Sequence, residues 1–263
     1  MILVMIMRIT NIKKSGNKYK IEFSSGRSIL TFDNVILDNN LLYDKKIDDS
    51  LYDKIVKETS YYGNYNDVLK KISRKMMSEE EVKRLLVKKD VSLEDIEKII
   101  NKLKEINLIN DRQYALAYTN DRINLSMDGP YKIKRNLEEN KIDDDIIMEA
   151  LEVFSEDIIN EKIKKIIDKK LKNNTKDTNY IFKQKVSLYL SNLGYGKENI
   201  VFNLDNVYVD NKNLEREMEK IFDKLKDKYD GYILKSKLKQ KLFSKGFTNE
   251  EIADFINKNS SLI

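Results

Sequence analysis

The chain has 263 residues, of which 35% are charged and 41% hydrophobic, and its formal net charge is +5. One proline and eight glycines suit long amphipathic helices and argue against a sandwich, a barrel or a disordered chain. The absence of cysteine excludes disulfides and thiolate chemistry and favours a reducing compartment, so we expect a cytoplasmic protein. The absence of histidine removes the commonest general base and metal ligand, so we expect no enzyme, cofactor or metal.

Residues 1–60 predict a β-rich head with a connecting helix. Lys18–Phe23 alternates polar and apolar residues between two turn sequences, which is typical of a half-buried strand. With Arg8–Lys13 and Ser28–Phe32 it predicts a three-stranded meander, and Asp33–Leu42 reads as a short helix or a loop. Ser50–Thr59 reads as the connecting helix.

The first nine residues are apolar apart from Arg8 but are too short to cross a bilayer. They also lack the features of a signal peptide, so we expect no membrane partner. Met1, Met5 and Met7 leave the start codon open.

From about Tyr65 onward the apolar residues recur at helical spacing, and one helix end recurs four times. Each copy has a leucine, then four residues later a turn residue, an apolar residue and an N-cap candidate. The leucines are Leu86, Leu137, Leu190 and Leu242, which are 51, 53 and 52 residues apart. The turn residues are Asp90, Lys141, Gly194 and Gly246, and the N-cap candidates are Ser92, Asp143, Gly196 and Thr248.

This register predicts a mainly α-helical fold of tandem three-helix repeats in a curved array behind the β-rich head. We place the repeats at residues 61–109, 110–154, 155–208 and 209–263. A helical bundle without internal homology is the alternative. Ser78 and Glu81 have the spacing of a capping box, which predicts a helix start at Ser78.

Three passages resemble the RecX family. Asn110-Asp111-Arg112-Gln113-Tyr114-Ala115, followed by Arg122, is similar to the family's link between its first two three-helix repeats. Gly129–Leu137 resembles the family's "gly-x-x-x-ile-x-x-x-leu" helix, and Ile72–Val82 resembles its "arg-x-arg-ser-x-x-glu-leu" passage. Two positions depart from the pattern: Met77 stands where a second cation is usual, and Asn140-Lys141 replaces a glycine.

The resemblance covers residues 65–150 most clearly, while the head and four repeats match the longer members of low-GC Gram-positive bacteria. It implies Met7 as the initiator. It also implies a monomeric, non-enzymatic regulator of recombination and DNA repair. Such a protein would lie in the groove of the RecA filament, on its single-stranded DNA, and inhibit the ATPase and strand exchange of RecA.

The candidate contacts with RecA or DNA are basic and aromatic side chains of the first two repeats. Arginine offers a planar fork for phosphate or carboxylate, and five of the eight arginines lie here. The alternative for each lysine is that it only keeps an exposed helix face in contact with solvent. For Tyr114 and Tyr118, helical spacing favours a position in the core. The candidates are Lys70, Lys71, Arg74, Lys75, Lys83, Arg84, Lys88, Lys89, Arg112, Tyr114, Arg122, Lys132, Lys134 and Arg135.

Two other functions stay open. A stand-alone single-stranded nucleic-acid-binding protein would show steep salt dependence with DNA alone. A scaffold for an unrelated protein partner would not bind RecA filaments.

Overall fold

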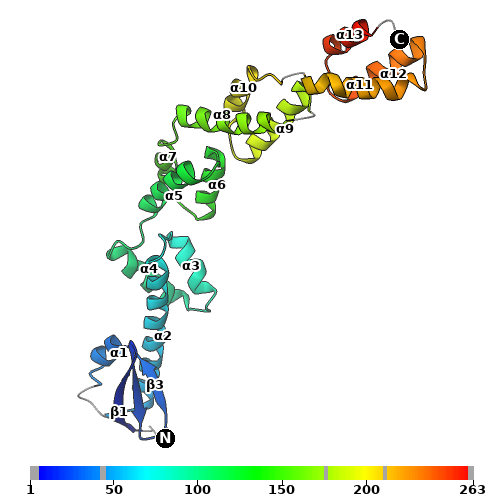
Figure 1. Cartoon of the computed structure of the whole chain (residues 1–263). Coiled ribbons are helices and arrows are strands. Elements are labelled where there is room, and N and C mark those ends of the chain that lie inside the picture. The colour runs from blue at the N-terminus through cyan, green and yellow to red at the C-terminus, as the bar shows by residue number, and fades with distance from the viewer. Residues whose placement is uncertain (1–5, 42–45, 175–176, 210–211, 260–263) are drawn as a thin grey trace. The chain divides into compact units, whose positions relative to one another are not determined.

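The computed structural model describes residues 6–41, 46–174, 177–209 and 212–259. These residues form thirteen helices and four strands (Figure 1). The chain divides into two compact units, Met1–Tyr114 and Ala115–Ile263, which we describe separately. None of the helices in the described ranges is long and apolar enough to cross a membrane. Met1 and Met5 lie outside the described residues.

The first unit begins with an antiparallel sheet of order β3-β2-β1-β4. Strands β1 (Met7–Ser15), β2 (Lys18–Phe23) and β3 (Ser28–Thr31) form the predicted meander. The prediction of three strands was incomplete, because a fourth strand, β4 (Lys46–Ile47), pairs with the start of β1. Two residues are too short a segment to show the period-2 pattern that identifies a strand.

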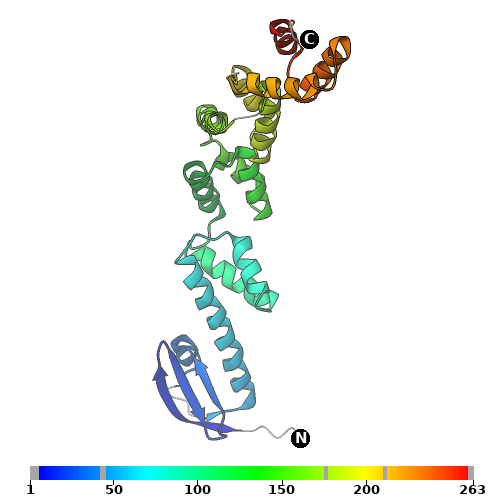
Figure 2. The ribbon, with the colours of Figure 1, turned by 45° about the vertical axis from the view of Figure 1, so that its right-hand side comes forward.

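One face of the sheet packs against helix α1 (Asp33–Asp38) and the first half of α2 (Asp49–Ile72). Met7, Ile21 and Ile55 are fully buried in this core. The predicted connecting helix was too short, since α2 continues thirteen residues beyond Thr59 and through Gly63. Figure 2 shows this long helix leaving the sheet. Its second half packs into the next core through Val68, so the boundary proposed after residue 60 falls inside one helix.

The remaining helices group in threes by sequence, as the repeat predicts. The first group is the end of α2 with α3 (Glu79–Val87) and α4 (Leu93–Glu105). The second is α5 (Asp111–Leu125), α6 (Pro130–Glu139) and α7 (Asp144–Leu151). The third is α8 (Glu156–Lys172), α9 (Asn179–Asn192) and α10 (Lys197–Asp205). The fourth is α11 (Lys212–Lys226), α12 (Gly231–Ser244) and α13 (Asn249–Lys258). The curvature of the array and the exact domain limits stay predictions.

All four copies end their second helix in the same way. The turn residues Asp90, Lys141, Gly194 and Gly246 have φ of 55°, 54°, 88° and 85°. In each copy the amide of the apolar residue after this turn residue donates to the carbonyl of the repeat leucine, over 3.1 to 3.3 Å. This is the Schellman motif, and each of the four leucines is fully buried. The fourfold register read from the sequence is therefore a repeat of structure.

Candidate functional site

The residues that carry the family resemblance hold the helices in place. The Asp111 carboxylate accepts a hydrogen bond of 2.9 Å from the amide of Glu79, at the start of α3. Asn110 accepts from the amide of Gln113 and so caps α5. Ser78 is buried and forms the predicted capping box with Glu81. These side chains satisfy helix-end amides that would otherwise lack a partner.

The two departures from the family pattern also have structural explanations. Met77 is 5% exposed and packs in the core of the first helical unit, where a cation would be costly to bury. Lys141 takes the left-handed backbone conformation that a glycine would adopt without strain. Met77 therefore offers no charged group where the family pattern has a cation.

Eight candidate cations lie close together in sequence, at the end of α2, on α3 and in the segments that follow these helices, and all are exposed. Three of them already have carboxylate partners: Lys75 with Glu81, Arg84 with Glu80 and Lys89 with Asp67. The Lys89 ion pair holds the pKa of Asp67 below its usual value. Within the described ranges the other side chains form no ion pair or hydrogen bond. They are Lys70, Lys71, Arg74, Lys83 and Lys88.

The candidates of the second repeat are more strongly engaged. The buried Asp128 carboxylate lies 2.7 Å from Lys132 Nζ and 3.7 Å from an Arg122 nitrogen. Lys134 pairs with Glu138 at 3.7 Å. Arg112 is exposed and has interactions of its own. Arg135 is exposed and, among the residues that the structure describes, has no charged partner.

The side chains of the two candidate tyrosines already have contacts within the protein. Tyr114 is 7% exposed, so most of its ring packs against the protein. The Tyr118 hydroxyl accepts a hydrogen bond of 2.8 Å from Asn136, and the Arg122 guanidinium lies 4.9 Å from its ring centroid. This agrees with the core position that their helical spacing favours.

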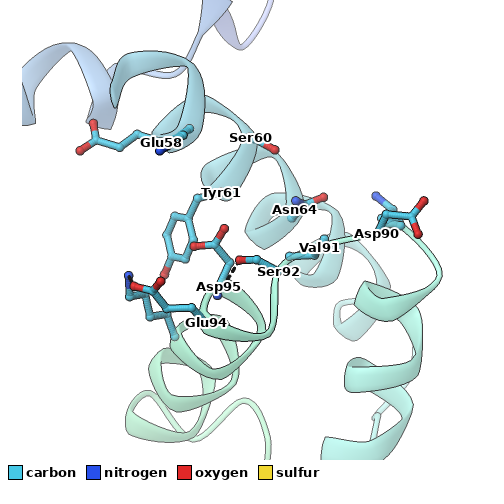
Figure 3. A pocket seen from close by; sticks show the side chains of 12 residues that line it. Glu58, Ser60, Tyr61, Asn64, Asp90, Val91, Ser92, Glu94 and Asp95 are labelled. Carbon is cyan, nitrogen blue, oxygen red and sulfur yellow. Dashed lines mark hydrogen bonds and ion pairs between the residues drawn. The ribbon is translucent and has the colours of Figure 1, made fainter. Parts of the chain in front are cut away.

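A polar groove lies between the middle of α2 and the turn into α4 (Figure 3). Tyr61 points toward Asp95 and Glu94 across it, and burial of the ring raises the pKa of Tyr61. Two of its polar side chains are engaged: the Ser92 hydroxyl accepts from the amide of Asp95, and Glu94 pairs with Lys98 at 2.6 Å. No group of three or more potential metal-ligating residues occurs in the described part of the chain.

The lysines of α12 are absent from the candidates that the sequence suggested. This helix carries four lysines and no acidic residue, and all four are exposed. Arginine content and the family resemblance both point to the first two repeats, away from this helix. The signal that could have identified it is a fourteen-residue helix whose charges have a single sign.

Two family models match the chain. The second three-helix domain of RecX matches residues 110–151, and the third three-helix domain matches residues 210–256. The two segments correspond to α5–α7 and to α11–α13, with α8–α10 between them.

Relatives match the chain along nearly its whole length. The regulatory protein RecX of Oceanobacillus iheyensis is 28% identical over 96% of this chain and 97% of its own. That of Bacillus cereus strain G9842 is 29% identical over 97% of each chain.

Two solved structures are similar. A crystal structure of regulatory protein RecX has a TM-score of 0.64 and 24% identity and covers 76% of this chain and 100% of its own, which supports the fold. The crystal structure of RecX from Lactobacillus salivarius is 30% identical, has a TM-score of 0.51 and covers 56% of this chain and 97% of its own. Sequence, repeat register and fold thus agree, and the chain belongs to the RecX family of regulatory proteins.

Proposed function

We propose that this protein regulates homologous recombination by binding the RecA nucleoprotein filament and inhibiting its ATPase and strand exchange. The observation that carries the proposal is family membership along the whole chain, because full-length relatives are named regulatory protein RecX. Consecutive three-helix units with exposed outer faces support it, because stacked repeats present extended binding surfaces.

The contacts of the first two repeats that we favour are the exposed cations without an intramolecular ion pair. A cation that already pairs with a carboxylate must give up that partner before it binds another, and its gain is correspondingly smaller. This selects a subset of the candidates for contact with RecA or its DNA. The subset is Lys70, Lys71, Arg74, Lys83, Lys88 and Arg135.

Several weak contacts along one filament would combine through avidity. Each repeat that engages a filament subunit makes binding by the next repeat intramolecular, which raises its effective concentration. A protein held across neighbouring RecA subunits would restrain the movements that accompany ATP hydrolysis. No chemical step by this chain is required.

Filament binding can be measured by co-sedimentation with RecA on single-stranded DNA. We expect Arg74→Glu and Arg135→Glu each to weaken binding, because both reverse an exposed charge without breaking an ion pair. Lys14→Glu makes the same kind of reversal at an exposed position of β1 and should bind like the unchanged protein. Equal binding by all four proteins would rule out the selected contacts, and no binding by the unchanged protein would rule out the proposal.

A second function, stand-alone binding of single-stranded nucleic acid, is favoured by the exposed lysines of α12. The comparison that separates the two is affinity for RecA-coated DNA against affinity for the bare strand. Tighter binding to the coated strand supports the regulator. Equal or weaker binding to it supports the stand-alone function.

A further inference from the structure

The strongest one-sided charge in the described chain lies on α12, the orange helix of the last repeat in Figure 1. Its lysines are Lys235, Lys237, Lys239 and Lys241, and Lys245 follows directly. All five are exposed, and within the described ranges none of their side chains forms an ion pair or hydrogen bond. Elsewhere in the same repeat, Lys220, Lys226 and Lys258 pair with nearby carboxylates.

The helix also exposes aromatic rings at both of its ends. Tyr232 is 86% exposed and Phe243 is 63% exposed. These positions are eleven residues apart, which places them on one face of the helix about 16 Å from each other. Lys235 and Lys239 lie on that same face between the two rings, since they follow Tyr232 by three and seven residues. A different face, about 100° around the helix axis, is apolar and buried through Leu234, Leu238 and Leu242.

The groove beside this face adds no negative charge. Lys239, Gln240 and Phe243 line one wall, and Asn249, Ile252 and Ala253 of α13 line the other. The acidic residues of α13, Glu250, Glu251 and Asp254, do not line this groove, and Glu251 is occupied in the capping box with Thr248. An anionic ligand could therefore lie along α12 without meeting a carboxylate on the groove walls.

We propose that the exposed face of α12 binds single-stranded nucleic acid, with its lysines on the phosphates and Tyr232 and Phe243 stacked on bases. Cations interleaved with aromatic rings match a ligand that carries phosphates and unstacked bases together, as a single strand does and a duplex does not. Contacts between lysines and phosphates carry no sequence information, and every base has a face on which an aromatic ring can stack, so the binding is independent of sequence. The inference rests on the proposed function only for the choice of DNA as the nucleic acid.

The test is fluorescence anisotropy of a labelled oligothymidylate titrated with the full-length protein at several salt concentrations. Replacing Lys235 and Lys239 by Gln should weaken binding and reduce the log–log salt slope by about 0.7 for each phosphate that a lysine no longer neutralises. The matched control replaces Lys165 and Lys220 by Gln. These lysines are exposed but ion-paired, so the net charge changes equally while affinity and slope should stay closer to those of the unchanged protein.

The aromatic part of the proposal is tested separately. Tyr232→Ala and Phe243→Ala should each lower affinity at least about fivefold, because stacking contributes about 1–3 kcal/mol per base. Leu93→Ala removes a comparably exposed apolar side chain from α4 and should not change affinity.

Three results would overturn the inference. The first is that the unchanged protein does not bind the bare strand at low salt. The second is that the α12 lysine pair and the control lysine pair lose affinity equally. The third is that affinity is unchanged after each of the two aromatic substitutions. The RecA ATPase assay uses a different readout. A protein that inhibits RecA but fails these tests would refute the α12 site alone.

Discussion

The backbone amide of Gly129 donates a hydrogen bond of 2.7 Å to the carbonyl oxygen of Leu193, joining the second repeat to the third. The amide of Tyr131 donates to the carbonyl of Gly194 over 3.0 Å at the same joint. Lys162 Nζ from α8 donates to the carbonyl of Ser126 over 2.7 Å. The second and third repeats are therefore joined by backbone hydrogen bonds between the start of α6 and the turn that ends α9.

Gly194→Ala should destabilise the second unit strongly. A Cβ at Gly194 would lie 2.4 Å from the amide nitrogen of Lys132, and φ of +88° adds backbone strain. Strain and overpacking together should cost on the order of 2–4 kcal/mol. Gly231→Ala is the control, because Gly231 also has positive φ but open space around it, so only about 1 kcal/mol is expected. Urea denaturation followed by circular dichroism measures both, and equal costs would show that the joint is looser than described.

Asp90→Gly should stabilise the first unit by about 1 kcal/mol. Asp90 holds φ of 55°, a conformation in which the Cβ of a non-glycine residue is strained. Asp90→Ala keeps the Cβ and serves as the control, so it should give no such gain. Thermal unfolding of the two variants compares them directly, and a gain for alanine as large as for glycine would assign the effect to the removed charge.

Thr248→Ala should cost more stability than Asp143→Ala, although both residues are N-caps. Thr248 accepts a hydrogen bond of 3.1 Å from the amide of Glu251. Its loss should cost about 1 kcal/mol. The Asp143 side chain makes no capping hydrogen bond, so its replacement removes only an interaction with the helix dipole, about 0.5 kcal/mol. Chemical denaturation at neutral pH would contradict the description if Asp143→Ala proved the more damaging.

Tyr195→Phe should change how stability depends on pH. The buried Tyr195 hydroxyl donates to the carbonyl of Met127 over 3.1 Å, and burial raises the pKa of Tyr195 above its ordinary value. Near neutral pH the loss of this bond should cost about 1 kcal/mol. Above about pH 10 the unfolded tyrosine ionises while the buried one stays protonated, so the unchanged protein loses the stability that Tyr195 contributes, and the variant has no such contribution to lose. The gap between the two melting temperatures should narrow above about pH 10, and a constant gap would show that Tyr195 is not buried.

The sequence predicted the repeats well because their determinants are local. The Schellman turns depend on a leucine, a turn residue and an apolar residue at fixed spacing, and all four sets are visible in the sequence. The length of α2 was missed because the expected helix ended at Thr59, before Gly63 and its neighbouring tyrosines, which have weak helix propensity. In the structure Tyr61 and Tyr65 pack against the first helical core, which overrides the weak helix propensity.

The candidate contacts were less predictable because they depend on tertiary partners. Lys89 pairs with Asp67 across twenty-two residues, which no local pattern indicates. The Lys132–Asp128 pair, in contrast, has i,i+4 spacing and could have been anticipated. The single-sign charge of α12 was readable from the sequence, but the exposure of Tyr232 and Phe243 was not.

The most direct test of the central claim is the ATP hydrolysis rate of RecA on single-stranded DNA with increasing amounts of this protein. We predict a concentration-dependent fall in the rate, a weaker fall with Arg74→Glu and Arg135→Glu, and a fall with Lys14→Glu equal to that of the unchanged protein. A hydrolysis rate that stays constant at saturating amounts of the unchanged protein would contradict the proposed function.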